Sequence, residues 1–247
     1  MLIRHVGAAD KTAPDVMQST SRHLNWTVWG GLVLTVLVIA AAFISSRLQS
    51  GSSRLPVLWQ VQDFSLTNQS GAVVSLSDLR GSVWVADIIF TRCPGPCAFM
   101  TKRMAELQGA LPPDSPVKLV SLTTDPEFDS PKVLQDYARR FGARDERWQF
   151  LTGTKQAIFD LAVRDLKLAL QELPPDKRTV PNDLFLHSTR FVLVDKQGRV
   201  RGVFDMLPEV TPADEPPDSE AVKASHEAQM KAQQQALLQA IATLAKE

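Results

Sequence analysis

Both cysteines of this chain lie in one short stretch, residues 91–97, with the sequence TRCPGPC. The preceding residues 83–90 are almost all apolar, which predicts a strand buried within a sheet. Residues 98–110 carry apolar side chains at helical spacing and end before a Pro-Pro pair, which predicts a helix. We therefore expect Cys93 and Cys97 on a strand-to-helix turn, close to the N-terminus of the helix.

The position of this turn favours reactive thiolates over a structural disulfide. Free backbone N–H groups and the positive end of the helix dipole lower a thiol pKa, and the thiolate is the form that binds metal or attacks a disulfide. A disulfide closing so short a loop stabilises a fold by only about 2 kcal/mol, against about 4.7 kcal/mol for a loop of about 100 residues. Redox chemistry or soft-metal binding is the favoured role of both cysteines.

An uncharged apolar run, residues 26–44, precedes this region. As a helix rising about 1.5 Å per residue it is about long enough to cross a hydrocarbon core of about 30 Å. It exceeds the apolar core of about 7–15 residues in a signal peptide, so an uncleaved anchor is favoured over a cleaved signal. Three basic residues precede the run and two follow it closely, which favours a cytoplasmic tail at 1–25. The remaining chain would then lie on the extracytoplasmic (periplasmic) side of a membrane.

The chain after this run divides into a linker, a domain, a second linker and a helix. Residues 45–55 are serine-rich and 208–218 are acidic and proline-rich, which predicts linkers. Residues 219–247 predict a C-terminal helix with a narrow apolar stripe, either docked on the domain or associated with a partner. The domain at 56–207 is long enough to bury a core.

Strands and helices alternate along the domain, which predicts an α/β fold with a mixed sheet covered by helices on both faces. One helix is expected from Ser130, a cap followed by proline, to Gly142, and another from the cap Thr154. Residues 173–183 predict a polar loop. The expected strands are 64–66, 73–76, 83–90, 117–122, 148–151, 166–170, 191–194 and 200–204.

Of the four histidines, only His187 lies inside the predicted domain. A lone histidine beside apolar residues is more often a packed or surface residue than a metal ligand. In a thioredoxin-type arrangement, however, the strand 191–194 lies beside the cysteine strand. That arrangement would bring His187 close to the cysteine turn.

Two thiolates and one imidazole make a soft set of three ligands. Thiolates select Cu(I) and Zn(II), and imidazole suits both metals. A structural zinc site needs a fourth protein ligand, for which Asp125 is one candidate, whereas three-coordinate Cu(I) needs none. The ligand count of Cys93, Cys97 and His187 therefore favours copper, foremost as Cu(I) and secondarily as Cu(II).

From about residue 60 to 206 the chain resembles the Sco/SenC family, membrane-tethered copper-binding proteins with a thioredoxin-like fold. The spacing of the CxxxC turn and the later histidine is specific, and an Asp-Pro segment adds independent support, whereas the hairpin alone would also fit peroxiredoxins. The matching parts are the hairpin region 64–81, Cys93-Pro94-x-x-Cys97, the segment 125–131 (DPEFDSP), the segment 148–153 (WQFLTG) and His187-Ser188.

The resemblance implies that Cys93, Cys97 and His187 bind copper, and that copper is delivered to the copper-centre subunit of cytochrome c oxidase. The chain departs from the family pattern at Ala98, where proline is frequent, and at Leu186, where aspartate is frequent. Loss of that aspartate removes a partner that could orient the histidine ring.

Asp125 and Asp129 also belong to the matched segment. The sequence assigns neither of them a chemical role, and a helix cap or a loop-fixing contact accounts for them equally well.

Two other functions compete with a copper chaperone. A thiol-disulfide oxidoreductase or redox sensor acting on the oxidase's copper-site cysteines would use the same thiols. That class carries CxxC in this fold, and it has a cis-proline facing the cysteines, whereas the nearest proline before His187 is Pro181. A peroxidase needs Thr and Arg near a peroxidatic cysteine, and Thr91 and Arg92 directly before Cys93 fit that pattern poorly.

We therefore expect a binding protein without catalytic residues rather than an enzyme. The chain has 27 basic and 27 acidic residues, a balance that gives no indication of nucleic acid as a partner.

Overall fold

The structure is a computed structural model that describes residues 29–41, 54–207 and 219–247. The chain divides into two compact units, Met1–Ser53 and Arg54–Glu247. The predicted cytoplasmic tail, most of the first linker and the acidic second linker lie outside the described residues.

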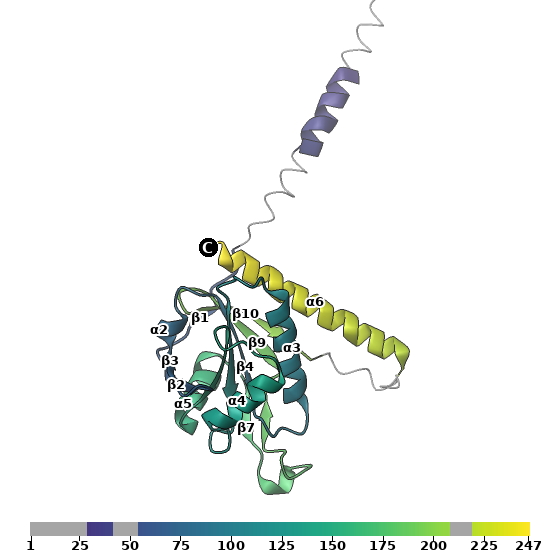
Figure 1. The fold of residues 1–247 in the computed structure, drawn as a ribbon. Helices are drawn as coiled ribbons and strands as arrows, with labels where there is room; N and C mark the ends of the chain where they lie inside the picture. Colours follow the sequence, from purple (N-terminus) through teal and green to yellow (C-terminus); the bar gives the residue numbers. More distant parts are fainter. Residues whose placement is uncertain (1–28, 42–53, 208–218) are drawn as a thin grey trace, which may run out of the picture. The chain divides into compact units, whose positions relative to one another are not determined.

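In the first unit, residues 29–41 form a helix, drawn in purple in Figure 1. The other residues of the predicted anchor, 26–28 and 42–44, lie outside the described part of the chain. Among the helices that the structure describes, none is both long and apolar enough to cross a membrane.

The second unit is an α/β fold in which helices cover both faces of an eight-stranded sheet (Figure 1). The strand order is β1-β10-β9-β4-β5-β6-β2-β3, and β7 and β8 form a separate two-stranded sheet. The strands are β1 (Trp59–Gln60), β2 (Ser65–Asn68), β3 (Val73–Ser75), β4 (Trp84–Ile89), β5 (Lys118–Thr123), β6 (Trp148–Thr152), β7 (Leu170–Glu172), β8 (Phe185–His187), β9 (Arg190–Val194) and β10 (Arg199–Asp205). The helices are α2 (Leu76–Leu79), α3 (Pro96–Ala110), α4 (Pro131–Arg140), α5 (Lys155–Phe159) and α6 (Glu220–Ala245), with a π-helical turn at Asp160–Asp165 and a 3-10 turn at Pro175–Lys177.

Strand β4 lies in the middle of the sheet because its residues are apolar on both faces. All of its residues are buried, and it pairs in parallel with β5 and antiparallel with β9. Ile89 at the end of β4 lies opposite Thr123 at the end of β5. The turn that follows β4 and the loop that follows β5 therefore leave the sheet side by side. The predicted mixed sheet is confirmed.

The apolar residues form one core on each face of the sheet. Helices α3, α4 and α6 contribute to the first core, whose members include Met100, Met104, Leu134, Tyr137, Leu237 and Ile241. Helices α2 and α5 and the π-helical turn contribute to the second, whose members include Leu76, Leu79, Ile158, Leu161 and Ala162.

The helix starts follow the predicted capping residues. The Ser130 side chain accepts a hydrogen bond from the Val133 N–H, and the Thr154 side chain accepts one from the Ala157 N–H. Gly142 follows α4 with a φ of 67°, a left-handed conformation that glycine adopts without strain. These local predictions are confirmed.

One predicted strand is misplaced. The sequence predicts a strand at 166–170, whereas β7 begins at Leu170 and the helical path runs to Asp165. Leu166 and Leu168 are fully buried in the second core. Their apolar side chains pack there just after the end of a helix and do not belong to a strand. β7 pairs with β8, so two strands flank the predicted loop.

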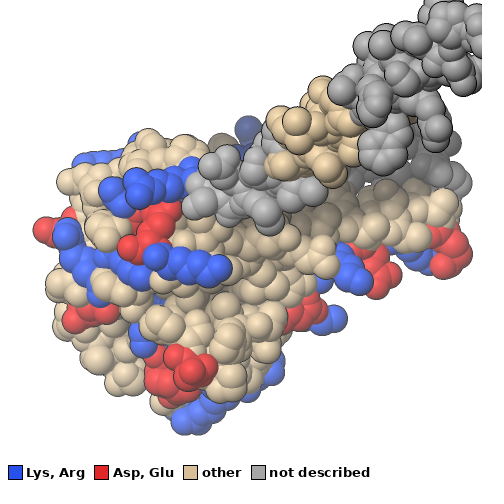
Figure 2. Space-filling view, turned by 90° about the horizontal axis from the view of Figure 1, so that it is seen from above, with Lys and Arg blue, Asp and Glu red and all other residues tan. Residues whose placement is uncertain are grey.

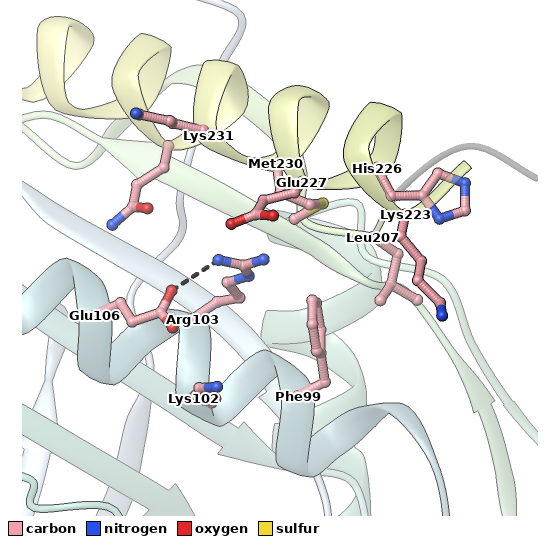
Figure 3. Close-up of a pocket in the computed structure, with 11 residues that line it drawn as sticks. Phe99, Lys102, Arg103, Glu106, Leu207, Lys223, His226, Glu227, Met230 and Lys231 are labelled. Carbon is pink, nitrogen blue, oxygen red and sulfur yellow. Dashed lines mark hydrogen bonds and ion pairs between the residues drawn. The ribbon is translucent and has the colours of Figure 1, made fainter. Parts of the chain in front are cut away.

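Helix α6 docks on the domain through its apolar stripe, because Leu237, Ile241 and Leu244 are buried in the first core. Its N-terminal half and α3 border a groove of about 790 Å³ (Figure 3). Charged residues line much of this groove, and the Arg103 side chain donates a hydrogen bond to Glu106 at 2.8 Å. Basic and acidic side chains are likewise interspersed over the face seen in Figure 2.

Arg201 joins three parts of the domain at one edge of the sheet. Its guanidinium donates to the backbone carbonyls of Leu55 and Pro56, to Asp195 at 2.8 Å and to the side chain of Glu247 at 2.8 Å. The residue is 4% exposed, and Asp195 is 2% exposed. A buried ion pair with this many hydrogen bonds leaves a costly unpaired charge when one partner is removed.

We predict that Arg201→Met lowers the free energy of unfolding by about 3 kcal/mol, because it removes the buried one of the two arginine partners of Asp195 and the hydrogen bonds to Leu55, Pro56 and Glu247, while Arg199 remains paired with Asp195. Urea denaturation of the full chain measures this loss. The matched control is Arg190→Met, which removes an exposed ion pair with Asp205 and should cost about 0–1 kcal/mol. Equal losses in the two variants would contradict the prediction.

Candidate metal centre

The structure brings together Cys93, Cys97 and His187, the three residues that the sequence singles out. Their two sulfur atoms and one ring nitrogen all lie within 4.8 Å of one another. The Sγ atom of Cys97 lies 3.0 Å from Nε2 of His187, although the two residues are 90 positions apart. This spacing suits three ligands of a single metal ion.

The β7–β8 hairpin places His187 at the centre. His187 is the last residue of β8 and pairs with Leu170 of β7. Its Nδ1 lies 3.0 Å from the carbonyl oxygen of Ser188, and its ring meets the ring of Phe90 edge-on at 5.8 Å between centroids. Because a carbonyl only accepts, Nδ1 carries a proton, and Nε2 is the ring nitrogen that faces the sulfurs.

This arrangement accounts for the departure at Leu186. The Leu186 side chain is 62% exposed, so it takes no part in orienting the ring. The Ser188 carbonyl supplies the hydrogen-bond acceptor that a carboxylate could otherwise provide.

Cys97 occupies the protected side of the centre. It is 1% exposed on the first turn of α3, and its Sγ accepts a hydrogen bond from the Phe90 N–H at 3.4 Å. Burial raises the pKa of the Cys97 thiol, and the neighbouring sulfur of Cys93 raises it further. Without a bound metal, Cys97 therefore keeps its proton.

Cys93 occupies the open side of the centre. It is partly buried, and its Sγ accepts a hydrogen bond from the Gly95 N–H at 3.4 Å. A hydrogen bond from the Cys97 thiol lowers the pKa of Cys93 to about 4, with a further contribution from His187 and opposition from burial. The centre thus holds one thiolate and one thiol, and a metal must displace the proton of Cys97 to bind both sulfurs.

A buried carboxyl group beneath the centre was not singled out by the sequence analysis. Asp87 of β4 is fully buried, and its Oδ1 accepts a hydrogen bond from the Ser121 hydroxyl at 2.6 Å. Burial raises the pKa of Asp87 to about 7. The available signal is a single acidic residue within an otherwise apolar strand.

The two acidic residues of the segment 125–131 lie beside the centre but are bound to other groups. Oδ2 of Asp125 accepts a hydrogen bond from the Arg92 side chain at 2.7 Å. Asp129 accepts hydrogen bonds from the backbone N–H and the hydroxyl of Thr91. Asp125, which the sequence offers as a fourth metal ligand, is thus paired with Arg92 and does not belong to the group of ligand atoms that lie within 4.8 Å of one another. The sequence shows both acids but not their partners, because these contacts form only where β4 and β5 end side by side in the sheet.

A mixed sheet with helices on both faces, and a centre of two thiols and one imidazole after its middle strand, define a thioredoxin-like domain with a soft-metal site. Residues 58–215 match the SCO1/SenC family model, so the chain belongs to the SCO1/SenC family. The resemblance noted from the sequence is thereby confirmed.

Among curated relatives, the SCO1 protein homologue of Bacillus subtilis is 36% identical over 147 residues. The match covers 59% of this chain and 73% of that protein. An SCO2-like protein of Rickettsia felis is 28% identical over 138 residues, which cover 56% of this chain and 65% of that protein.

Solved structures show the same fold. BsSco, described as a member of the Sco family of cytochrome c oxidase assembly proteins and as having a disulfide switch, is 34% identical with a TM-score of 0.53, over 62% of this chain and 88% of BsSco. A SCO1/SenC family lipoprotein of Bacillus anthracis is 28% identical with a TM-score of 0.53, over 72% of this chain and 96% of the lipoprotein. The copper-bound ScoI of Bradyrhizobium japonicum, 21% identical with a TM-score of 0.52 over 70% of this chain and 99% of ScoI, supports the fold alone.

We predict that the reduced, metal-free protein carries one cysteine thiolate at neutral pH, on Cys93. Its absorbance at the thiolate band should fall with a midpoint near pH 4 and disappear in Cys93→Ser, while Cys97→Ser should keep a thiolate with a higher midpoint. The folded pKa of Cys93 lies below its unfolded value of 9.0, so this thiolate stabilises the fold fully above pH 9. That stabilisation declines as the pH falls and is lost below about pH 4. Two thiolates at pH 7, or none, would contradict the assignment.

Proposed function

We propose that this protein is a copper metallochaperone that carries copper on Cys93, Cys97 and His187. The observation that carries the proposal is the convergence of two sulfurs and one imidazole nitrogen within 4.8 Å. A soft ligand set of this kind suits Cu(I), which can be three-coordinate. Membership of the SCO1/SenC family supports the choice of copper.

The state of the neighbouring carboxylate also supports copper over zinc. A structural zinc site is almost always four-coordinate. The candidate fourth ligand, Asp125, is paired with Arg92, and the ligand group among the described residues consists of two sulfurs and one nitrogen. We infer that the site holds Cu(I) as its cargo and Cu(II) less tightly.

Exposure of Cys93 provides a route for transfer. Cys97 is buried, whereas Cys93 lies partly exposed on the turn. A thiolate of an acceptor protein would approach copper from the Cys93 side and replace the protein's sulfurs one at a time. We propose the copper-centre subunit of cytochrome c oxidase as the acceptor, because BsSco is described as a member of a family of oxidase assembly proteins.

A thiol-disulfide oxidoreductase is the second candidate function. The contrast between the two thiols favours it, because the pKa of Cys93 is lowered to about 4 while that of Cys97 is raised. A low-pKa, partly exposed thiolate is the attacking group in disulfide exchange, and a neighbouring thiol resolves the mixed disulfide. In that reaction the Cys93 thiolate attacks the substrate disulfide, and Cys97 gives up its proton and displaces the substrate to form the Cys93–Cys97 disulfide. Two electrons pass to the substrate, whose two sulfurs take up the proton of Cys97 and one proton from water.

We further propose that residues 26–44 anchor the protein in a membrane and that the domain faces the extracytoplasmic side. The uncharged length of this run and the basic residues before it support the proposal.

The deciding prediction concerns His187→Ala. Removal of one of three ligands should weaken Cu(I) binding by at least about 100-fold. Changing a residue that only hydrogen-bonds to a metal ligand typically costs less, about 10–100-fold in affinity. A competition assay with a Cu(I) chelator measures this change. Histidine 226 lies on α6 outside the centre, so His226→Ala is the matched control and should retain the affinity of the unmodified protein.

The same variant separates the two candidate functions. A chaperone should lose the ability to support oxidase assembly under limiting copper when His187 is removed. A reductase should lose only part of its activity, since both thiols remain. Normal oxidase activity in cells that contain His187→Ala at the usual level would favour the reductase. Cysteine variants are inactive under either function and do not discriminate.

The membrane topology has its own test. A reporter that is active only after export should work when fused after Glu247, and a reporter that is active only in the cytoplasm should not. The reverse pattern would contradict the proposed orientation.

A further inference from the structure

The three residues of the centre are held in place to different degrees. Cys97 is fixed by α3 and by the Phe90 N–H, and His187 is fixed by β8 and the Ser188 carbonyl. Cys93 lies in neither a helix nor a strand, and its own backbone N–H bonds the Phe90 carbonyl at 3.2 Å. Its sulfur accepts a hydrogen bond from the Gly95 N–H at 3.4 Å, within the same turn. The place of the sulfur therefore depends on how the turn as a whole is held, and the residues directly before Cys93 make the contacts that hold it.

The first of these, Thr91, is bound to a buried carboxylate. Asp129 is 0% exposed, and its Oδ2 accepts a hydrogen bond from the Thr91 N–H at 3.1 Å. The Thr91 and Thr123 hydroxyls both donate to the same carboxylate. A buried carboxylate with three donors fixes its partners, because releasing any of them leaves a desolvated charge without compensation.

The second, Arg92, is bound to the neighbouring acid of the same loop. Its Nε donates to Oδ2 of Asp125 at 2.7 Å, and its guanidinium lies 4.4 Å from the ring centroid of Phe128. Asp125 is 4% exposed, so its charge needs this partner. The ion pair and the ring contact hold the Arg92 side chain from two sides.

The loop that carries both acids is itself closed by hydrogen bonds between its own residues. The backbone N–H groups of Phe128 and Asp129 donate to the Asp125 carbonyl at 3.1 and 2.9 Å. The Asp125 N–H donates to the Thr123 hydroxyl at 3.0 Å. The loop also begins at the end of β5, beside the end of β4. It is therefore a fixed support rather than a free segment.

We propose that Asp125 and Asp129 are positioning residues that hold Cys93, through Arg92 and Thr91, at the distance where its sulfur shares one metal ion with Cys97 and His187. This inference rests on the proposed copper-binding function. In this proposal Asp125 is not a ligand of the metal ion. It acts on the ion only through the place of Cys93.

The test uses the full chain and compares Asp129→Asn, Thr91→Val, Asp125→Asn and Arg92→Gln. Each should weaken Cu(I) binding by about 10-fold or more, as is typical when a group behind a ligand is changed. Asp136→Asn is the matched control, because Asp136 is exposed on α4 and pairs with Lys132. Its Cu(I) affinity should stay within about twofold of the unmodified protein, as expected for an exposed pair.

Two double variants test whether each acid acts through its partner. Thr91→Val with Asp129→Asn, and Arg92→Gln with Asp125→Asn, should each bind Cu(I) within about threefold of the weaker single variant. If Asp125 were a metal ligand, Asp125→Asn would weaken binding further in the Arg92→Gln background. That outcome overturns the proposal for Asp125.

The midpoint potential of the Cys93–Cys97 disulfide distinguishes positioning from mere stability. A loosened turn lowers the effective concentration of one thiol at the other, so the potential should become less negative in the four single variants. Lower melting temperatures with unchanged copper affinity and unchanged potential would show a structural role only, and would overturn the proposal. If Asp129→Asn does not fold, Thr91→Val and Arg92→Gln carry the same comparison.

Failure of this inference differs from failure of the proposed function. If the unmodified chain does not bind Cu(I), the proposed function is wrong, and the positioning proposal that rests on it falls with it. If the unmodified chain binds Cu(I) and the four variants bind it equally well, only the positioning role is wrong.

Discussion

The contact between Cys97 and His187 sets the requirements that the rest of the domain meets. Sulfur and ring nitrogen lie 3.0 Å apart, yet one belongs to the first turn of α3 and the other to a hairpin 90 residues later. Strand β4 is buried and leads into the turn before α3, and the pairing of β7 with β8 holds His187 at the end of its strand. The geometry of the centre therefore depends on the packing of the sheet, since a loss of register in β4 or in the β7–β8 pair would separate the Cys97 sulfur from the His187 ring nitrogen.

The centre combines a rigid inner side with an accessible outer side. Cys97 and His187 are held by backbone groups, namely the Phe90 N–H and the Ser188 carbonyl, which no side-chain change removes. Cys93 has backbone contacts with Phe90 and Gly95, and it depends in addition on the contacts that Thr91 and Arg92 make with the two acids. Such a division would suit the proposed copper carrier, because two ligands would retain the ion while the third yields to an incoming thiolate.

The sequence was sufficient for the parts that depend on local chemistry. Apolar β4, the caps Ser130 and Thr154 and the cysteine turn follow from short-range patterns, and the structure has each of them. The sequence was insufficient where burial comes from distant elements. The apolar residues Leu166 and Leu168 predict a strand, but in the structure they pack in the core just after the end of a helix. Likewise, the partners of the two acids after β5 become visible only once the strands are paired, and so does the Ser188 carbonyl that orients the histidine.

The network of Arg201 has a mechanical consequence. Arg201 follows Val200, which lies opposite Val194, and Val194 lies opposite Trp84 at the start of β4, whereas the cysteine turn follows the end of β4. The residue that ties the Leu55 carbonyl to Glu247 therefore sits at the opposite end of the sheet from the metal centre. A force applied to the chain before Leu55 would act first on Arg201, and through it on Glu247 at the end of α6 and on Asp195 in the β9–β10 turn. If residues 26–44 anchor the protein as proposed, a pull on that anchor would therefore act at the end of the sheet away from the metal centre.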